Sequence, residues 1–343
     1  MSYVLGGDIG GTRSRFSLVE LGKGQKRTEI HHDVLESRSF RTFEDALAKF
    51  VASARDQGLI VKKKVVAASF GIAGPIVDQR VKATNLPWTI DAKTVSKKLG
   101  GARVTLLNDL VTQGLGALEA PSSKLKSLQG GLPKKRGANV AVIAAGTGLG
   151  EASFVWDGAR HVPCATEGGH CDFAPANAVE RMLYDRMAKQ PHHPCWEDVA
   201  SGSSIAVLYD FCVTERRLKE SARGRAFFLD ALDKNVAVVE LAEKHASVPA
   251  RAAIELWAAL YGAEAGNLAL KSLATGGVYL CGGVSARLVD VLAGEGAKGE
   301  RSFRERFVDK GKMRGLLEKV PIAVVLEPRA GLLGAVSHAV SQA

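Results

Sequence analysis

The chain has 343 residues, of which 46% are hydrophobic and 24% charged, and its formal net charge is +10. This composition is typical of a globular protein and excludes a collagen-like, coiled-coil or intrinsically disordered chain, while the length predicts about two domains. No apolar run reaches the roughly 18 residues of a membrane span, and basic residues do not alternate with aromatic ones as in single-strand binding proteins. We therefore expect neither a membrane nor a nucleic acid as a partner. The five cysteines include no Cys-x-x-Cys pair, which predicts a reducing, cytoplasmic location.

The first third of the chain alternates predicted strands and helices. Two apolar runs within residues 3–21 flank a Gly-rich turn, a pattern that predicts a β-hairpin. Apolar residues at helical spacing predict a helix over residues 43–57. The other predicted elements here are a strand at 64–70, a short helix at 94–99, a strand at 103–107 and a helix ending at Glu119.

The remainder of the chain repeats this organisation after a polar connection. Residues 121–137 show no periodicity, and we predict a domain boundary near residue 120. A second strand–Gly-turn–strand unit follows at 139–156, which favours a duplicated architecture and an α/β fold with mixed sheets. The other predicted elements are helices over 225–247 and 252–274, strands at 277–281 and 322–326, and a closing helix at 331–340.

The first Gly-rich turn carries the segment Asp8-Ile9-Gly10-Gly11-Thr12. Glycines allow a close backbone approach and let amide N–H groups converge on an anion, and Thr12 adds a hydroxyl donor. Asp8, at the end of the strand, is suited to holding hydrated Mg²⁺ through water. The alternative is an ordinary hairpin turn with an incidental aspartate.

The second Gly-rich turn is Gly146-Thr147-Gly148-Leu149-Gly150. Its glycine spacing differs from the dinucleotide-binding pattern Gly-x-Gly-x-x-Gly, and the chain has no P-loop sequence. Two such turns, one in each half, predict a nucleotide phosphate held by two hairpin turns.

Asn108-Asp109 lies where a predicted strand ends and a helix begins. Both residue types are favoured helix N-caps, so a purely structural role explains the pair. The functional interpretation is a carboxylate base at the carboxyl end of a strand, which accepts the proton of an alcohol during phosphoryl transfer.

Polar side chains also gather at Glu167-Gly168-Gly169-His170 and at Glu197. Glu167 and His170 could bind adjacent sugar hydroxyls, whereas the two glycines between them argue against a helical di-iron motif. Histidines near residue 192 and Cys195 lack the paired cysteines of a zinc site. The structural alternative for Glu197 is a glutamate in the first turn of a helix.

Taken in order, these segments resemble the bacterial ATP-dependent glucokinases of the non-ROK type, in the hexokinase-like branch of the actin-like ATPase superfamily. The resemblance runs from Gly6 to about Ala335 and includes the segment Ala83–Trp88. It implies a two-domain α/β actin-like (ribonuclease H-like) fold with an interdomain cleft. We expect a small domain of residues 1–119 plus 327–343 and a large domain of residues 120–326.

The resemblance also implies site residues and ligands. Asp109 matches the base that activates the 6-hydroxyl of glucose, so the expected reaction produces glucose 6-phosphate and ADP with ATP and Mg²⁺. The expected partners are glucose and ATP, in a homodimer. The remaining glucose ligands implied are Asn85, Asn108, Glu167, His170 and Glu197. The phosphate and adenosine segments implied are Asp8, Gly10, Gly11, Thr12, Gly146, Thr147, Gly148, Gly282 and Gly283.

Two other functions stay open on the sequence. One is a kinase for another hexose, such as fructose, mannose or an N-acetyl hexosamine. The other is a non-catalytic actin-like nucleotide-binding regulator, because a fold alone does not determine function. One departure from the family is Arg13, which stands directly after the first Gly-Gly-Thr where an asparagine is common.

Overall fold

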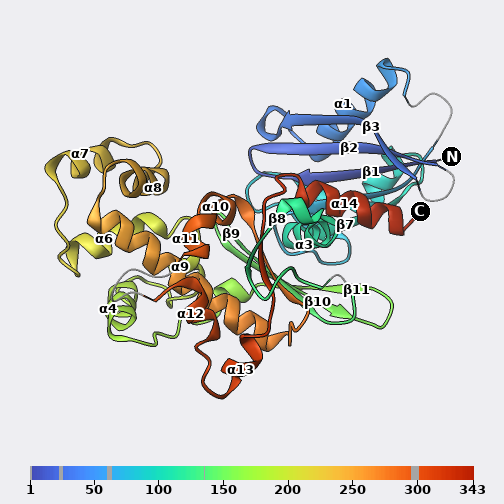
Figure 1. Ribbon diagram of the computed structural model, residues 1–343. Coiled ribbons are helices and arrows are strands. Elements are labelled where there is room, and N and C mark those ends of the chain that lie inside the picture. Colours follow the sequence, from blue (N-terminus) through green and yellow to red (C-terminus); the bar gives the residue numbers. More distant parts are fainter. Residues whose placement is uncertain (1, 23–25, 60–63, 135, 295–300) are drawn as a thin grey trace. The chain divides into compact units, whose positions relative to one another are not determined.

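The computed structural model describes residues 2–22, 26–59, 64–134, 136–294 and 301–343. The chain divides into two compact units (Figure 1): unit 1 comprises the chain up to Lys124 together with Glu327–Ala343, and unit 2 comprises Leu125–Leu326. Unit 1 therefore takes residues from both ends of the sequence. Within the described ranges, no helix has both the length and the apolar character needed to span a membrane.

Unit 1 is built on a five-stranded mixed sheet with the order β3-β2-β1-β4-β7. The first three strands pair antiparallel, whereas β4 and β7 join them in parallel. The five strands are β1 (Ser2–Ile9), β2 (Arg13–Leu21), β3 (Arg27–Glu36), β4 (Val65–Ile72) and β7 (Arg103–Asn108). A separate hairpin consists of β5 (Arg80–Lys82) and β6 (Thr89–Asp91).

The helices of unit 1 cover this sheet. They are α1 (Phe43–Asp56), α2 (Ala92–Lys98), α3 (Asp109–Glu119) and the C-terminal α14 (Ala330–Ser341), with short 3-10 turns η2 (Ser37–Ser39) and η3 (Ser122–Lys124). Thr42 and Asp45 form a capping box that starts α1, as the sequence of its first turn favours. Helices α3 and α14 lie side by side (Figure 1). Glycines allow this close contact, because a Cβ at Gly116 would overlap the carbonyl oxygen of Ala330.

Unit 2 is built on a six-stranded sheet with the order β11-β10-β9-β12-β13-β8. Its strands are β8 (Leu125–Gln129), β9 (Val140–Ala145), β10 (Leu149–Trp156), β11 (His161–Thr166), β12 (Gly277–Cys281) and β13 (Ile322–Val325). Strands β9, β10 and β11 pair antiparallel, and β12 and β13 follow in parallel. Apart from the edge strand β8, this repeats the topology of unit 1, so the predicted duplication is confirmed at the level of strand order.

The helical part of unit 2 is organised around α9 (Val248–Lys271), which is buried on almost all sides. Its other longer helices are α4 (Ala178–Met187), α6 (Ile205–Thr214), α7 (Ala222–Asp230) and α8 (Lys234–Lys244). The short ones are α5 (Glu197–Ala200), α10 (Gly282–Arg287), α11 (Val289–Ala293), α12 (Phe303–Val308), α13 (Arg314–Leu317), η4 (Gly168–His170) and η5 (Gly311–Met313).

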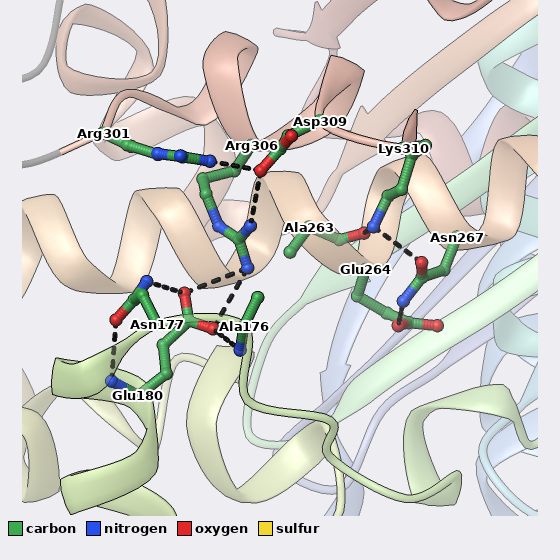
Figure 2. A network of polar contacts seen from close by, with 10 residues as sticks. All are labelled: Ala176, Asn177, Glu180, Ala263, Glu264, Asn267, Arg301, Arg306, Asp309 and Lys310. Carbon is green, nitrogen blue, oxygen red and sulfur yellow. Dashed lines mark hydrogen bonds and ion pairs between the residues drawn. The ribbon is translucent and has the colours of Figure 1, made fainter. Parts of the chain in front are cut away.

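A buried ion pair connects two of these helices. Figure 2 shows Arg306 of α12 between Asp309 and Glu180 of α4. The Arg306 Nη2 to Glu180 Oε1 distance is 3.0 Å, and the two side chains are 4% and 1% exposed. Glu180 also accepts hydrogen bonds from the backbone N–H of Ala176 and from Asn177 Nδ2, so its charge is compensated by several donors.

The α/β class with mixed sheets is confirmed, and most predicted elements lie within a few residues of the observed ones. Two predictions are wrong. Residues 225–247 are not one helix, because the chain breaks at Ala231 and Asp233 caps a new helix through the N–H groups of Asn235 and Val236. Residues 121–137 are not only a connection: β8 forms there and pairs antiparallel with β13.

Candidate active site

The turn between β1 and β2 is closed by a hydrogen bond from Gly10 N to Arg13 O of 3.1 Å. Thr12 and Arg13 at its tip are exposed. Gly11 lies against Asn85, since a Cβ at Gly11 would stand 2.8 Å from the Asn85 Cβ. The structure thus brings together two predicted site residues that are more than 70 positions apart in the chain.

The back of this turn is held by Ser37, a residue that the sequence interpretation missed. Ser37 Oγ donates to Gly10 O at 2.7 Å and Ser37 N donates to Thr12 O at 2.9 Å. The Ser14 and Ser37 hydroxyls are 2.9 Å apart, and both residues are buried. Hydrogen bonds from Ser37 therefore fix the first turn on its buried side, and the tip of the turn is exposed to solvent.

Asp8 precedes this turn and faces Arg15, its partner on the adjacent strand. Arg15 Nη1 lies 3.2 Å from Asp8 Oδ2. Burial raises the pKa of Asp8, and the Arg15 charge opposes that rise. Gly331, in the first turn of α14, approaches the same carboxylate: a Cβ there would lie 3.1 Å from Asp8 Oδ1. One carboxylate with a single cation on one oxygen is a donor set that fits a hydrated, phosphate-bound Mg²⁺.

Asn108 and Asp109 stand where β7 ends and α3 begins. The Leu110 N–H donates to Asn108 Oδ1 at 2.9 Å and to Asp109 Oδ1 at 2.9 Å. Asn108 is thus the N-cap of α3, so the structural interpretation of this residue is confirmed. Both side chains are half-buried, and the backbone donor fixes the orientation of the Asp109 carboxylate at the carboxyl end of a strand.

The turn between β9 and β10 is held by a different set of groups. Gly146 N donates to Gly148 O at 2.9 Å, and Gly202 N donates to Gly146 O at 2.9 Å. Ser203 Oγ donates to Thr147 O at 2.7 Å, a contact that the sequence interpretation missed although Ser203 belongs to a run of small polar residues after Glu197. Residues 202–203 therefore fix this turn from the segment that follows α5.

Glu197 lies directly behind the second turn. Its Oε2 accepts a hydrogen bond of 2.9 Å from Leu149 N, the first residue of β10. A Cβ at Gly148 would overlap the same oxygen, so Gly148 has to be a glycine for this contact to form. A candidate sugar ligand and a candidate phosphate turn are thus one connected structure.

Gly282 and Gly283 begin α10, directly after β12. Gly282 has φ +87°, and a Cβ there would lie 2.7 Å from Ala145 O at the end of β9. At Gly283 a Cβ would meet nothing within 4 Å. This turn therefore lies beside the start of the second Gly-rich turn and offers open backbone on one side.

Glu167 directly precedes η4 and His170 is its last residue, and both are exposed. The turn lies on β10: Cβ atoms at Gly168 and Gly169 would overlap Glu151 Oε2 and Leu149 O respectively. Glu151 is buried and was missed by the sequence interpretation. It is 2% exposed, and burial together with the nearby Glu264 charge raises its pKa to about 8.

The histidines near residue 192 pair with acids rather than with cysteines. His192 Nε2 lies 3.3 Å from Asp198 Oδ1, and His193 Nε2 lies 3.0 Å from Asp172 Oδ1. Cys195 donates to Asp198 Oδ2 through its Sγ at 3.3 Å. In the part of the chain that the structure describes, no group of three or more His, Cys, Asp or Glu side chains is arranged to hold a metal ion.

Comparison with known proteins assigns the chain to a family. The family model of Glucokinase matches residues 5–342. The chain belongs to the glucokinase family. A curated glucokinase from Synechocystis sp. is 34% identical over 348 residues, which covers 96% of each chain.

Solved structures agree with this assignment to the glucokinase family. The crystal structure of glucokinase from an Antarctic psychrotroph is similar, with 25% identity, a TM-score of 0.82 and coverage of 99% of each chain. A ROK family glucokinase from Streptomyces griseus, solved in complex with glucose and AMPPNP, shares the fold with a TM-score of 0.62 and 21% identity, with 100% of each chain covered. The predicted actin-like ATPase fold is confirmed by these neighbours.

Proposed function

We propose that this protein is a glucokinase that transfers the γ-phosphoryl group of ATP to the 6-hydroxyl of glucose. Membership of the glucokinase family supports the reaction class. The observation that carries the proposal is the position of Glu197 on the second Gly-rich turn, because a sugar-binding carboxylate and a phosphate-binding turn then share one support.

The proposal gives each predicted residue a role in the reaction. Asp109 accepts the 6-hydroxyl proton as the bond from O6 to the γ-phosphorus forms and the bond from that phosphorus to the β–γ bridging oxygen of ATP breaks, so ADP leaves. Its contact with Leu110 N–H keeps one carboxylate oxygen occupied and so orients the side chain for this task. Asn85, Asn108, Glu167, His170 and Glu197 bind the other hydroxyls and select the sugar.

The two Gly-rich turns hold the triphosphate in the same proposal. Gly10 N and Gly146 N close the two turns, and the backbone N–H groups of Gly11, Thr147 and Gly148, together with the Thr12 hydroxyl, donate to phosphate oxygens. Gly282 and Gly283 approach the adenosine. Asp8 would hold Mg²⁺ through water, and the ion would supply neutralisation of charge on the transferred phosphoryl group. Since the product is glucose 6-phosphate, we place the enzyme in glycolysis and in the cytoplasm.

The proposal includes a homodimer and no nucleic-acid or membrane partner. Large apolar side chains are exposed in unit 2 at Leu232, Val236 and Val248, which supports an apolar contact between subunits. Sedimentation at several protein concentrations tests the dimer. Large assemblies that form only with ATP would instead favour an actin-like regulator.

The decisive experiment is ADP release by the purified protein with Mg·ATP and one sugar at a time. The panel is glucose, fructose, mannose and N-acetylglucosamine, with product identification for each. Glucose-dependent release with glucose 6-phosphate as product is the expected result. Preference for another sugar would change the substrate, and release that no sugar stimulates would overturn the kinase assignment.

A further inference from the structure

Glu151 fills the space beneath the turn that carries two of the proposed glucose ligands. It lies opposite Thr166 on the adjacent strand, and its Oε2 occupies the position that a Cβ of Gly168 would take. The same Cβ would lie 3.0 Å from Thr166 Oγ1, which accepts a hydrogen bond from Gly168 N at 2.7 Å. Gly168 thus lies between the Glu151 carboxyl and the Thr166 hydroxyl, and a Cβ at this position would overlap the carboxyl.

We propose that Glu151 is a positioning residue of the glucose site: its buried carboxyl supports the Gly168–His170 turn where Glu167 and His170 can bind the sugar. The inference rests on the proposed function, because it assigns Glu151 a part in the same sugar site. Glu151 touches neither substrate nor nucleotide in this proposal and acts only through the turn.

The surroundings of Glu151 indicate that it carries a proton. Its neighbour Glu264, on α9, is fully buried and already accepts from two donors: Asn267 Nδ2 at 2.7 Å and Lys271 Nζ at 3.4 Å. Figure 2 shows the next link, in which the Asn267 side chain accepts from Lys310 Nζ at 2.7 Å. Burial raises the pKa of Glu264 too, but these donors and the Lys271 charge oppose that rise, so Glu264 is the member of the pair that ionises more readily.

Glu151 has no comparable set of donors. Among the described residues its buried Oε1 has no hydrogen-bond partner. Two carboxylates buried next to each other cannot both be charged at low cost, and only one of them here has donors that favour the charge. The proton of the pair therefore resides on Glu151, and a neutral carboxyl packs beneath Gly168.

A neutral Glu151 makes the sugar site sensitive to alkaline pH. Burial and the Glu264 charge raise the pKa of Glu151 to about 8, and Lys271 opposes the rise. Three titratable groups of α9 interact electrostatically with Glu151: Glu264, Lys271 and Tyr261. Cys171, on the far side of the turn, interacts with Lys271. Above that pH a second buried carboxylate forms under the turn, which has to move or admit water.

The test compares the wild type with Glu151→Ala and Glu151→Gln. Steady-state kinetics give the glucose KM and the ATP KM from about pH 6 to about pH 9, and calorimetry gives glucose affinity without ATP. The first variant removes the support, and we expect its glucose KM to rise by about 10-fold or more with the ATP KM within about twofold. The second keeps the size and a donor, and we expect it to restore glucose affinity to within about threefold of the wild type.

The pH profile separates positioning from mere stability. In the wild type the glucose KM should rise as pH passes about 8, and in Glu151→Gln this rise should disappear, since an amide does not ionise. The matched control is Glu180→Gln, which alters a buried carboxylate of the same unit that is paired with Arg306. It should lower the melting temperature and leave the glucose KM and its pH profile as in the wild type.

The outcomes distinguish this inference from the proposed function. A wild type that binds and phosphorylates no glucose overturns the proposed function before any variant is compared. An active wild type with unchanged glucose KM in Glu151→Ala, or with the same alkaline rise in Glu151→Gln, overturns the positioning role alone. If Glu151→Ala fails to fold, the pH profile of Glu151→Gln still decides between the two results.

Discussion

The turns Gly10–Arg13 and Gly146–Gly148 stand at the same place in two copies of one sheet topology, yet different groups hold them. In unit 1 the turn is fixed by Ser37, a buried residue that directly follows β3 of the same sheet. In unit 2 it is fixed by Gly202 and Ser203, which follow α5 and lie more than 50 positions further along the chain. The duplicated sheet topology therefore determines where each turn lies, whereas the hydrogen bonds that support the turn differ between the two units.

The difference has a consequence for the chemistry that each unit can supply. Unit 1 carries Asp8 before the first turn and Asp109 at the junction of β7 and α3. The second turn has Glu197 directly behind it and the Glu167–His170 turn on the same strand, β10. In the proposed function, unit 1 supplies the base, the metal-binding carboxylate and the amide ligands Asn85 and Asn108, whereas unit 2 supplies the carboxylate and imidazole ligands of the sugar.

The sharpest test of this division exchanges one carboxylate in each unit for an amide. Asp109→Asn keeps an oxygen for the Leu110 N–H but removes the base, so kcat should fall by about 10³-fold with glucose affinity within about threefold. Glu197→Gln should mainly raise the glucose KM. Steady-state kinetics and calorimetry measure both, and similar losses of kcat in the two variants would contradict the division.

Gly148→Ala should have the next largest effect. Its Cβ would overlap Glu197 Oε2, so the carboxylate has to leave Leu149 N and both the sugar ligand and the turn are disturbed. We expect kcat/KM for glucose to fall by about 100-fold, as for misplacement of a positioning group by about 1 Å. Gly315→Ala is the matched control in the same unit, because a Cβ there would meet nothing within 4 Å; activity lost equally in both would argue against a specific contact.

Removing the serine hydroxyl that supports each turn, Ser37 in unit 1 or Ser203 in unit 2, should have smaller effects on the protein. Here we expect the larger loss of stability in unit 1. Ser37→Ala leaves the buried Ser14 hydroxyl and Gly10 O without their partner, which should cost about 1–3 kcal/mol of unfolding free energy and raise the ATP KM several-fold. Ser203 is exposed, and Ser203→Ala should cost about 0.5 kcal/mol or less. Denaturant titration checks the order, and a larger loss for Ser203→Ala would reverse the comparison.

Local sequence patterns were sufficient for the elements whose causes are local. The hairpin over β1 and β2, the α1 helix and the Asn108 cap each depend on residues within one or two turns of each other. The break between α7 and α8 was missed because apolar residues continue through it, and Asp233 as a cap was outweighed by that pattern. Strand β8 has no alternation and forms only because β13 offers an edge to pair with.

The residues behind the candidate site were missed for a physical reason. Ser37 supports Gly10 and Glu151 supports Gly168 only after folding brings distant segments together. Glu197 was predicted as a sugar ligand, but its contact with the second turn depends on folding in the same way. A buried serine or glutamate carries no sequence signal for which backbone it will contact. The glycines did carry a sequence signal, since each marks a backbone position that another group approaches closely.

The return of α14 to unit 1 also affects how the protein is made. Helix α14 packs on α3 and on β1, where a Cβ at Gly6 would clash with the backbone of Val336. The ribosome synthesises these residues after the whole of unit 2, so one layer of unit 1 is still missing when the continuous unit 2 can already fold. Nascent chains stalled before Glu327 should therefore hold the sheet of unit 1 in a chaperone-binding, protease-sensitive state that chains long enough to include α14 leave.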